Sequence, residues 1–217
     1  MSTAAAAIHA EPGNKGVLGV TTGKLAMWLF LGSDGMSFMG LIATYVALRI
    51  GNWSNWPDPT KILGINLTAF NTFLLICSSV TMVKAFAASQ EGNVSRLKLW
   101  LFLTMLGGAI FVGIQVYEYN ELIHHGVALW DAEGTAPAVA SWLHPEIKGK
   151  SVLFMHTFYV CTCFHGCHVL SGVIYLGCIL IGVMRGRWTV NRIEIVGLYW
   201  HFVDLVWIVI FTIIYLF

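Results

Sequence analysis

The sequence has few charged residues, and this scarcity limits the classes of protein it can belong to. Only 11% of its 217 residues are Asp, Glu, Lys or Arg, whereas 57% are hydrophobic. A mean hydropathy of +0.74 excludes an ordinary soluble domain. The formal net charge of +1 gives no indication of a nucleic-acid partner. The composition is therefore that of a membrane protein.

Several motifs of nucleotide, metal and haem chemistry are also missing. The chain contains no GxxxxGK[ST], no Rossmann glycine set, no HExxH and no CxxCH. Its five Cys lack the spacing of a disulfide framework, and most lie in apolar runs, where Cys behaves as a small hydrophobic residue. The first residues have no basic segment ahead of an apolar core, so we expect no cleavable signal peptide.

Five apolar segments divide the chain, separated by more polar connections. Because a bilayer core about 30 Å thick requires about 20 apolar residues in a helix, each segment is long enough to cross it. We predict an all-α, polytopic membrane protein, a five-helix bundle that forms one domain over 24–217 after a flexible leader over 1–23. The predicted spans are about 24–48, 62–88, 97–119, 151–184 and 193–217.

Lys and Arg in the connections indicate the orientation of the bundle. With the N-terminus inside, eight basic residues lie on the inner side: Lys15, Lys24, Lys84, Arg96, Lys98, Arg185, Arg187 and Arg192. Four lie on the outer side: Arg49, Lys61, Lys148 and Lys150. This asymmetry predicts an inner N-terminus and an outer C-terminus.

The fourth segment, 151–184, contains no charged residue but carries polar side chains in its middle. At about 100° per residue, one helix face holds Cys161, His165, His168 and Gly172, and the opposite face holds His156, Cys163 and Cys167. Polar residues within a membrane usually face the interior of a bundle. We therefore expect this helix to have two protein-facing sides and only a narrow stripe facing lipid.

Two pairs on this helix have a spacing that metal or haem ligands can use. His165 and His168, at i and i+3, could share a ligand or could be core histidines bonded to neighbouring helices. Cys163 and Cys167, at i and i+4, resemble a soft-metal pair, but His156 lies too far along the axis to join both. We expect no metal or haem on this chain.

Three further ionisable residues lie near mid-depth in other spans. Asp34 is ten residues into the first span, about 15 Å deep at 1.5 Å per residue. It could be hydrogen-bonded to a neighbouring helix or to Ser33 or Ser37, or it could handle protons or pack against a partner. His201 and Asp204, at i and i+3 in the fifth span, could satisfy each other. We favour one interhelical polar cluster that joins them to His165, His168 or Asp34.

The remaining polar candidates lie near the ends of spans. Glu118 is followed by Glu121, His124 and His125, which is typical of a solvated helix end and less so of an outer metal site. Arg185 and Arg187 determine topology and could also hold phospholipid head groups.

Two runs carry a resemblance to a known family. FYVCTCFHGCHVLSGVIYL and VGLYWHFVDLVWIVIFTIIYLF are similar to the last two helices of subunit III of the haem-copper cytochrome c oxidases, in which FYxxTxFHGxHVxxG precedes WYWHFVDxVW. LFLGSDGMSFMG resembles the family helix with a buried acid, here Asp34 where the family has Glu. FNTFLLICSS and QVYEYNE also match, the latter placing a family acid at Glu118, and Glu194 fits the acid that precedes the final motif.

The resemblance implies a subunit without a redox centre in a proton-pumping oxidase that transfers electrons from cytochrome c to oxygen. It implies haems and copper in partner subunits, contact mainly with subunit I and also with subunit II, bound phospholipid, and support of assembly and proton uptake. His165, His168, His201 and Asp204 would join the fourth and fifth helices. The two extra N-terminal helices of seven-helix members are not seen, so we expect the five-helix bacterial type, in the cytoplasmic membrane.

Three alternatives remain open at this point. A quinol oxidase subunit III and the accessory subunit of a nitric oxide reductase share the same fold. A stand-alone proton or metal transporter would use the His and Asp residues directly, although no internal repeat supports an inverted-repeat transporter.

Overall fold

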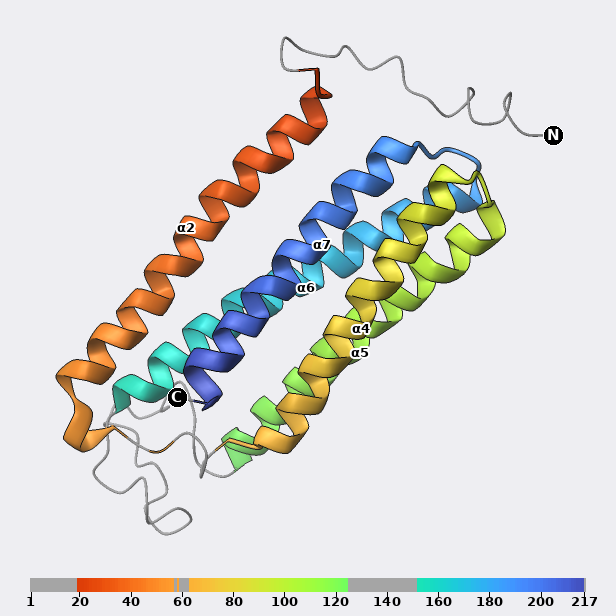
Figure 1. Cartoon of the computed structure of the whole chain (residues 1–217). Helices are drawn as coiled ribbons and strands as arrows, with labels where there is room; N and C mark the ends of the chain where they lie inside the picture. The colour runs from red at the N-terminus through yellow and green to blue at the C-terminus, as the bar shows by residue number, and fades with distance from the viewer. Residues whose placement is uncertain (1–18, 57, 59–62, 125–151, 217) are drawn as a thin grey trace.

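The computed structural model describes residues 19–56, 58, 63–124 and 152–216, and these ranges contain helices and no β-strand (Figure 1). The elements in order are α2 (Thr22–Gly51), the short 3₁₀ helix η1 (Trp53–Asn55), α4 (Ile65–Gln90), α5 (Val94–His124), α6 (Val152–Met184), α7 (Val190–Ile210) and the π-helical η2 (Phe211–Leu216).

Five of the described helices are long and apolar enough to cross a membrane, as predicted. Their most apolar windows have mean hydropathies from 1.4 to 2.1. The α2 and α5 helices extend several residues beyond the predicted spans at both ends, because interfacial polar residues such as Arg49 and Glu121 remain helical. The π-helical turn η2 completes the last span.

Helices α4 to α7 form a four-helix core in which α4 contacts α5 and α7, and α6 also contacts α5 and α7. Helix α2 packs outside this core against α6 and α7 (Figure 1). Only Asp34, Phe38 and Tyr45 of α2 are buried. The helix is therefore held mainly along one narrow stripe.

Two tight turns bring the ends of four helices to one end of the bundle (Figure 1). Gly92, with φ +69°, follows α4, and Gly186, with φ +70°, follows α6. A side chain is disfavoured at positive φ, which explains glycine at both positions. The Asn93 side chain then accepts a hydrogen bond from the Arg96 backbone N–H at 3.2 Å and caps α5. Gly92 and Asn93 therefore form the turn between α4 and α5.

Helix α6 differs from the expectation of two protein-facing sides. Cys161 and His165 are buried as predicted, but His156 and Cys167 on the opposite face are exposed in the isolated chain. The physical reason is that α2, α5 and α7 all pack on the other side of α6. The narrow lipid-facing stripe predicted for this helix is therefore a broad exposed face in the single chain.

Candidate functional site

An acid and an imidazole meet between α2 and α6. Nε2 of His168 lies 3.1 Å from Oδ1 of Asp34, and the side chains are 16% and 9% exposed. Nδ1 of His168 lies 2.8 Å from the carbonyl oxygen of Phe164. A carbonyl oxygen can only accept, so Nδ1 carries a hydrogen and donates it. The hydroxyls of Ser33 and Ser37 donate to carbonyl oxygens of their own helix, whereas Asp34 contacts His168.

Asp34 and His168 are therefore a paired acid and base at the contact between α2 and α6. The pair is less costly to place in a bilayer than either group alone. Phe38 covers it, with its ring centroid 5.2 Å from that of His168.

Tyr199 connects the same region to α7. Its hydroxyl donates to the His168 carbonyl oxygen at 3.0 Å and lies 2.7 Å from the Ser171 hydroxyl. Tyr199 belongs to the final sequence motif, and its bonds join α7 to α6 at the level of the acid–imidazole pair.

His201 forms a hydrogen bond with α4 rather than with α6. Its Nδ1 lies 2.9 Å from the hydroxyl oxygen of Ser79. Asp204 is buried near these two residues, and its Oδ1 has no hydrogen-bond partner among the described residues. The prediction named α6 as the helix that His201 and Asp204 join to α7. It is wrong, because this face of α7 is turned toward α4.

His165 is fully buried among aromatic rings. Its ring centroid lies 4.9 Å from that of Trp207, with the planes 30° apart, and 6.0 Å from that of Phe111. Neither ring nitrogen has a hydrogen-bond partner in the part of the chain that the structure describes. The indole N–H of Trp207 donates to Thr72 of α4 at 2.9 Å. His165 thus joins α6 to α7 by ring contact.

The interhelical pairing expected from the sequence is found between Asp34 and His168, but the expected cluster is divided. The structure separates it into the Asp34–His168 pair, the Ser79–His201–Asp204 group and the aromatic site of His165. The sequence argument missed the hydroxyl partners on α4. Polar residues recurring through that apolar span were the available signal: Thr68, Asn71, Thr72, Ser78 and Ser79.

Glu118 is buried inside the four-helix core, so the solvated helix end predicted for it is wrong. The Thr68 hydroxyl donates to its Oε1 at 2.9 Å, and the Gln115 amide lies 3.4 Å from its Oε2. Glu118 is 5% exposed, because its side chain points toward α4 while Glu121 points outward. His125 lies outside the described residues.

Within the described residues, no three His, Cys, Asp or Glu side chains gather as metal ligands would. His165 and His168 have different surroundings despite their i, i+3 spacing, and Cys167 is exposed.

At the end of α6, Arg185 and Arg187 are both exposed, as a contact with lipid head groups requires.

Comparison with known proteins shows a family match over most of the chain. The family model described as cytochrome c oxidase subunit III matches residues 7–128 and 147–217. Cytochrome c oxidase subunit 3 of Bacillus subtilis (strain 168) is 33% identical over 196 residues, which cover 88% of this chain and 84% of that protein.

Two other relatives differ in their named activity. The probable cytochrome c oxidase subunit 3 of Nocardia farcinica (strain IFM 10152) is 34% identical over 190 residues, covering 86% of this chain and 84% of that protein. The probable quinol oxidase subunit 3 of Staphylococcus aureus (strain USA300) is 30% identical over 196 residues, covering 89% and 88%.

Proposed function

Because the chain belongs to the cytochrome c oxidase subunit III family, we propose that it is the non-redox subunit III of a proton-pumping haem-copper terminal oxidase. The complex transfers electrons from cytochrome c to oxygen in a bacterial cytoplasmic membrane. Haems and copper lie in partner subunits, and this chain contacts mainly subunit I and also subunit II. Its N-terminus is inside and its C-terminus outside.

The Asp34–His168 pair is the observation that best supports a role near proton uptake. The two side chains are in contact between α2 and α6, and both are largely buried. In this proposal the pair accepts one proton and releases another, and it also fixes α2. The chain therefore contributes assembly and durability to the complex, and supports proton entry into the catalytic subunit.

Arg185 and Arg187 provide a second contribution, the binding of phospholipid head groups. Both side chains are exposed at the turn that joins α6 to α7. Basic residues at a membrane surface attract anionic lipids, by about 1 kcal/mol for each Lys or Arg.

Purification in a mild detergent tests the proposed function. We expect the chain to elute with haem absorbance and with a subunit that carries a copper-binding, cytochrome c docking domain. Elution with an oxidase that lacks this domain would support the quinol oxidase function named for the Staphylococcus aureus relative. A lone five-helix protein that moves protons or metal ions after reconstitution would contradict the subunit assignment.

A further inference from the structure

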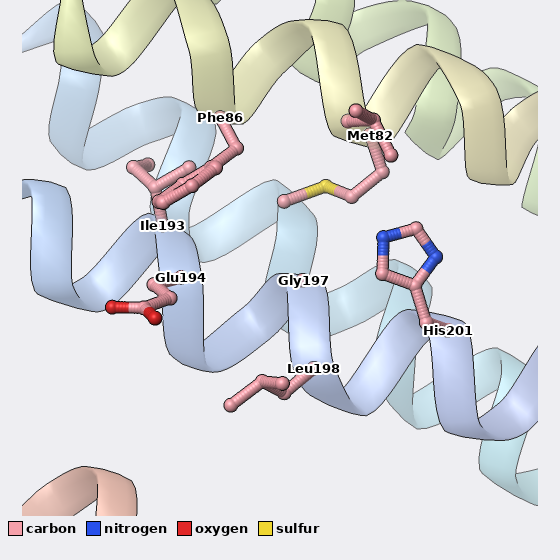
Figure 2. Close-up of a pocket in the computed structure, with 8 residues that line it drawn as sticks. Met82, Phe86, Ile193, Glu194, Gly197, Leu198 and His201 are labelled. Atoms are coloured by element: carbon pink, nitrogen blue, oxygen red, sulfur yellow. The ribbon is translucent and has the colours of Figure 1, made fainter.

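Glu118 differs from the other buried acids because the structure gives it no basic partner. Asp34 contacts His168. Asp204 lies near His201, whose ring borders a groove between α4 and α7 (Figure 2). Glu118 is 5% exposed, less than either of these acids, and no described Lys, Arg or His forms an ion pair with it. The charge state of Glu118 is therefore decided by uncharged neighbours.

Three uncharged side chains, from α4, α5 and η2, surround the Glu118 carboxyl group. The Thr68 hydroxyl lies 2.9 Å from Oε1, and the Gln115 amide lies 3.4 Å from Oε2. The fully buried Tyr215 hydroxyl lies beside Thr68 and Gln115. Neither this hydroxyl nor Oε1 of Gln115 has a hydrogen-bond partner in the described part of the chain. Two buried oxygen atoms next to the carboxyl group thus still require partners.

The titratable groups near Glu118 offer no positive charge. Tyr119 of α5, Tyr159 of α6 and Tyr215 of η2 are phenols. Glu121 of α5 is a second acid. A carboxylate at Glu118 would therefore be an uncompensated charge inside the bundle, which is far more costly than a neutral carboxylic acid.

A neutral acid allows the four side chains to close one ring of hydrogen bonds. The acid proton on Oε2 of Glu118 is donated to Oε1 of Gln115, after a half-turn of the amide that exchanges its oxygen and nitrogen. The Gln115 amide then donates to the Tyr215 oxygen, and the Tyr215 hydroxyl donates to Thr68. Thr68 donates to Oε1 of Glu118. Each side chain donates once and accepts once within the ring, so both oxygens without partners acquire them.

We infer that Glu118 holds one proton inside the four-helix core, as a neutral carboxylic acid in a ring with Thr68, Gln115 and Tyr215. This site is separate from the acid–imidazole pair between α2 and α6. Because η2 contributes Tyr215, the proton also fixes the end of the last span to α4 and α5. The inference concerns the core of this chain and does not depend on the proposed oxidase function.

Infrared difference spectroscopy of the purified full chain in its complex tests the proton. At about pH 6 a solvated glutamate, with a pKa of about 4.3, is ionised. We expect the spectrum of the parent minus that of Glu118→Gln to contain the carbonyl band of one protonated carboxyl group per chain. Glu121→Gln is the control, because Glu121 is exposed on the same helix and should lose a carboxylate band instead. Loss of a carboxylate band in Glu118→Gln would overturn the inference.

Tyr215→Phe tests the ring without changing the carboxyl group. We expect the acid band to remain but to shift in frequency, because the ring is opened, whereas Tyr117→Phe, at a side chain that is 60% exposed, should leave it in place. An acid band that Tyr215→Phe does not move would contradict the ring. This variant keeps Glu118, so it gives an answer independent of whether Glu118→Gln folds. Haem absorbance of the same preparations reports separately on association with an oxidase.

Discussion

Asp34 of α2 and His168 of α6 meet at 3.1 Å, and the second ring nitrogen of His168 is already engaged by the Phe164 carbonyl. The hydrogen-bond direction at Nδ1 of His168 is therefore fixed, and its Nε2 faces the Asp34 carboxyl group. Since few other residues of α2 are buried, this pair contributes a large part of the specific contact between α2 and the four-helix core.

Replacing Asp34 tests the role of this pair. Asp34→Ala removes the partner of a buried nitrogen, which costs about 1–3 kcal/mol. We expect unchanged haem content, with lower turnover or a shorter working life of the complex. Haem absorbance and oxygen consumption over time measure both.

Asp34→Asn is the matched control for that substitution. The amide N–H can donate to Nε2 of His168, so packing should be retained while proton exchange is lost. We expect normal stability with altered turnover. Loss of haem in either variant would mean that the pair is needed to assemble the catalytic subunit.

Thr68→Val tests the buried contact of Glu118. Valine has nearly the same shape but cannot donate to Oε1 of Glu118, so the variant should lose about 1–3 kcal/mol. Thr44 is exposed and its hydroxyl donates to the Gly40 carbonyl of its own helix, so Thr44→Val should change stability by less than about 0.5 kcal/mol. The midpoint of detergent-induced unfolding measures the difference, and equal midpoints would contradict the structural role of Glu118.

The amino-acid sequence was sufficient to predict the number of membrane helices but not the partners of their polar residues. Span length and hydropathy depend on composition within one segment, so five helices could be predicted. The partner of His201 depends on how α7 is rotated against α4. Asp204, three residues later on the same helix, appeared sufficient as a partner for His201. The 2.9 Å contact of His201 Nδ1 is instead to the hydroxyl oxygen of Ser79, 122 positions away in the chain.

The partner of Glu118, near the end of α5, also could not be predicted from the sequence. Its neighbours Glu121 and His124 are typical of a solvated terminus, and only the packing of α5 on α4 turns Glu118 inward to Thr68. The family resemblance had placed an acid at this position, but its surroundings could not be predicted from spacing along one helix.

Gly108→Ala should be among the most damaging small substitutions in the core. A Cβ there would collide with the ring of Trp200 and lie 2.8 Å from Cγ2 of Val173. Trp200 is 1% exposed and its indole N–H donates to Ser78 at 3.1 Å, so it cannot move freely. We expect a loss of about 1–3 kcal/mol. A thermal midpoint equal to that of the parent protein would contradict this close packing.

Gly113→Ala on the same helix is the control for that change. Its Cβ enters open space, and replacing glycine by alanine in a helix interior favours the helix by up to about 1 kcal/mol. The two alanines should therefore shift the thermal midpoint in opposite directions.

The ion pair between Lys24 and Glu194 connects the beginning of α2 to α7, beside a hydrogen bond from Thr21 to Asn191 at 2.9 Å. The side chains are 21% and 33% exposed, so the interaction is partly screened by solvent. A double-mutant cycle with Lys24→Ala and Glu194→Ala should give a coupling energy of about 0.2–1 kcal/mol that falls as salt is added. The exchanged pair, Lys24→Glu with Glu194→Lys, should recover part of the stability lost by either single reversal. A coupling that salt does not change, or single reversals without effect, would show that α2 is held by its apolar stripe and by Asp34 alone.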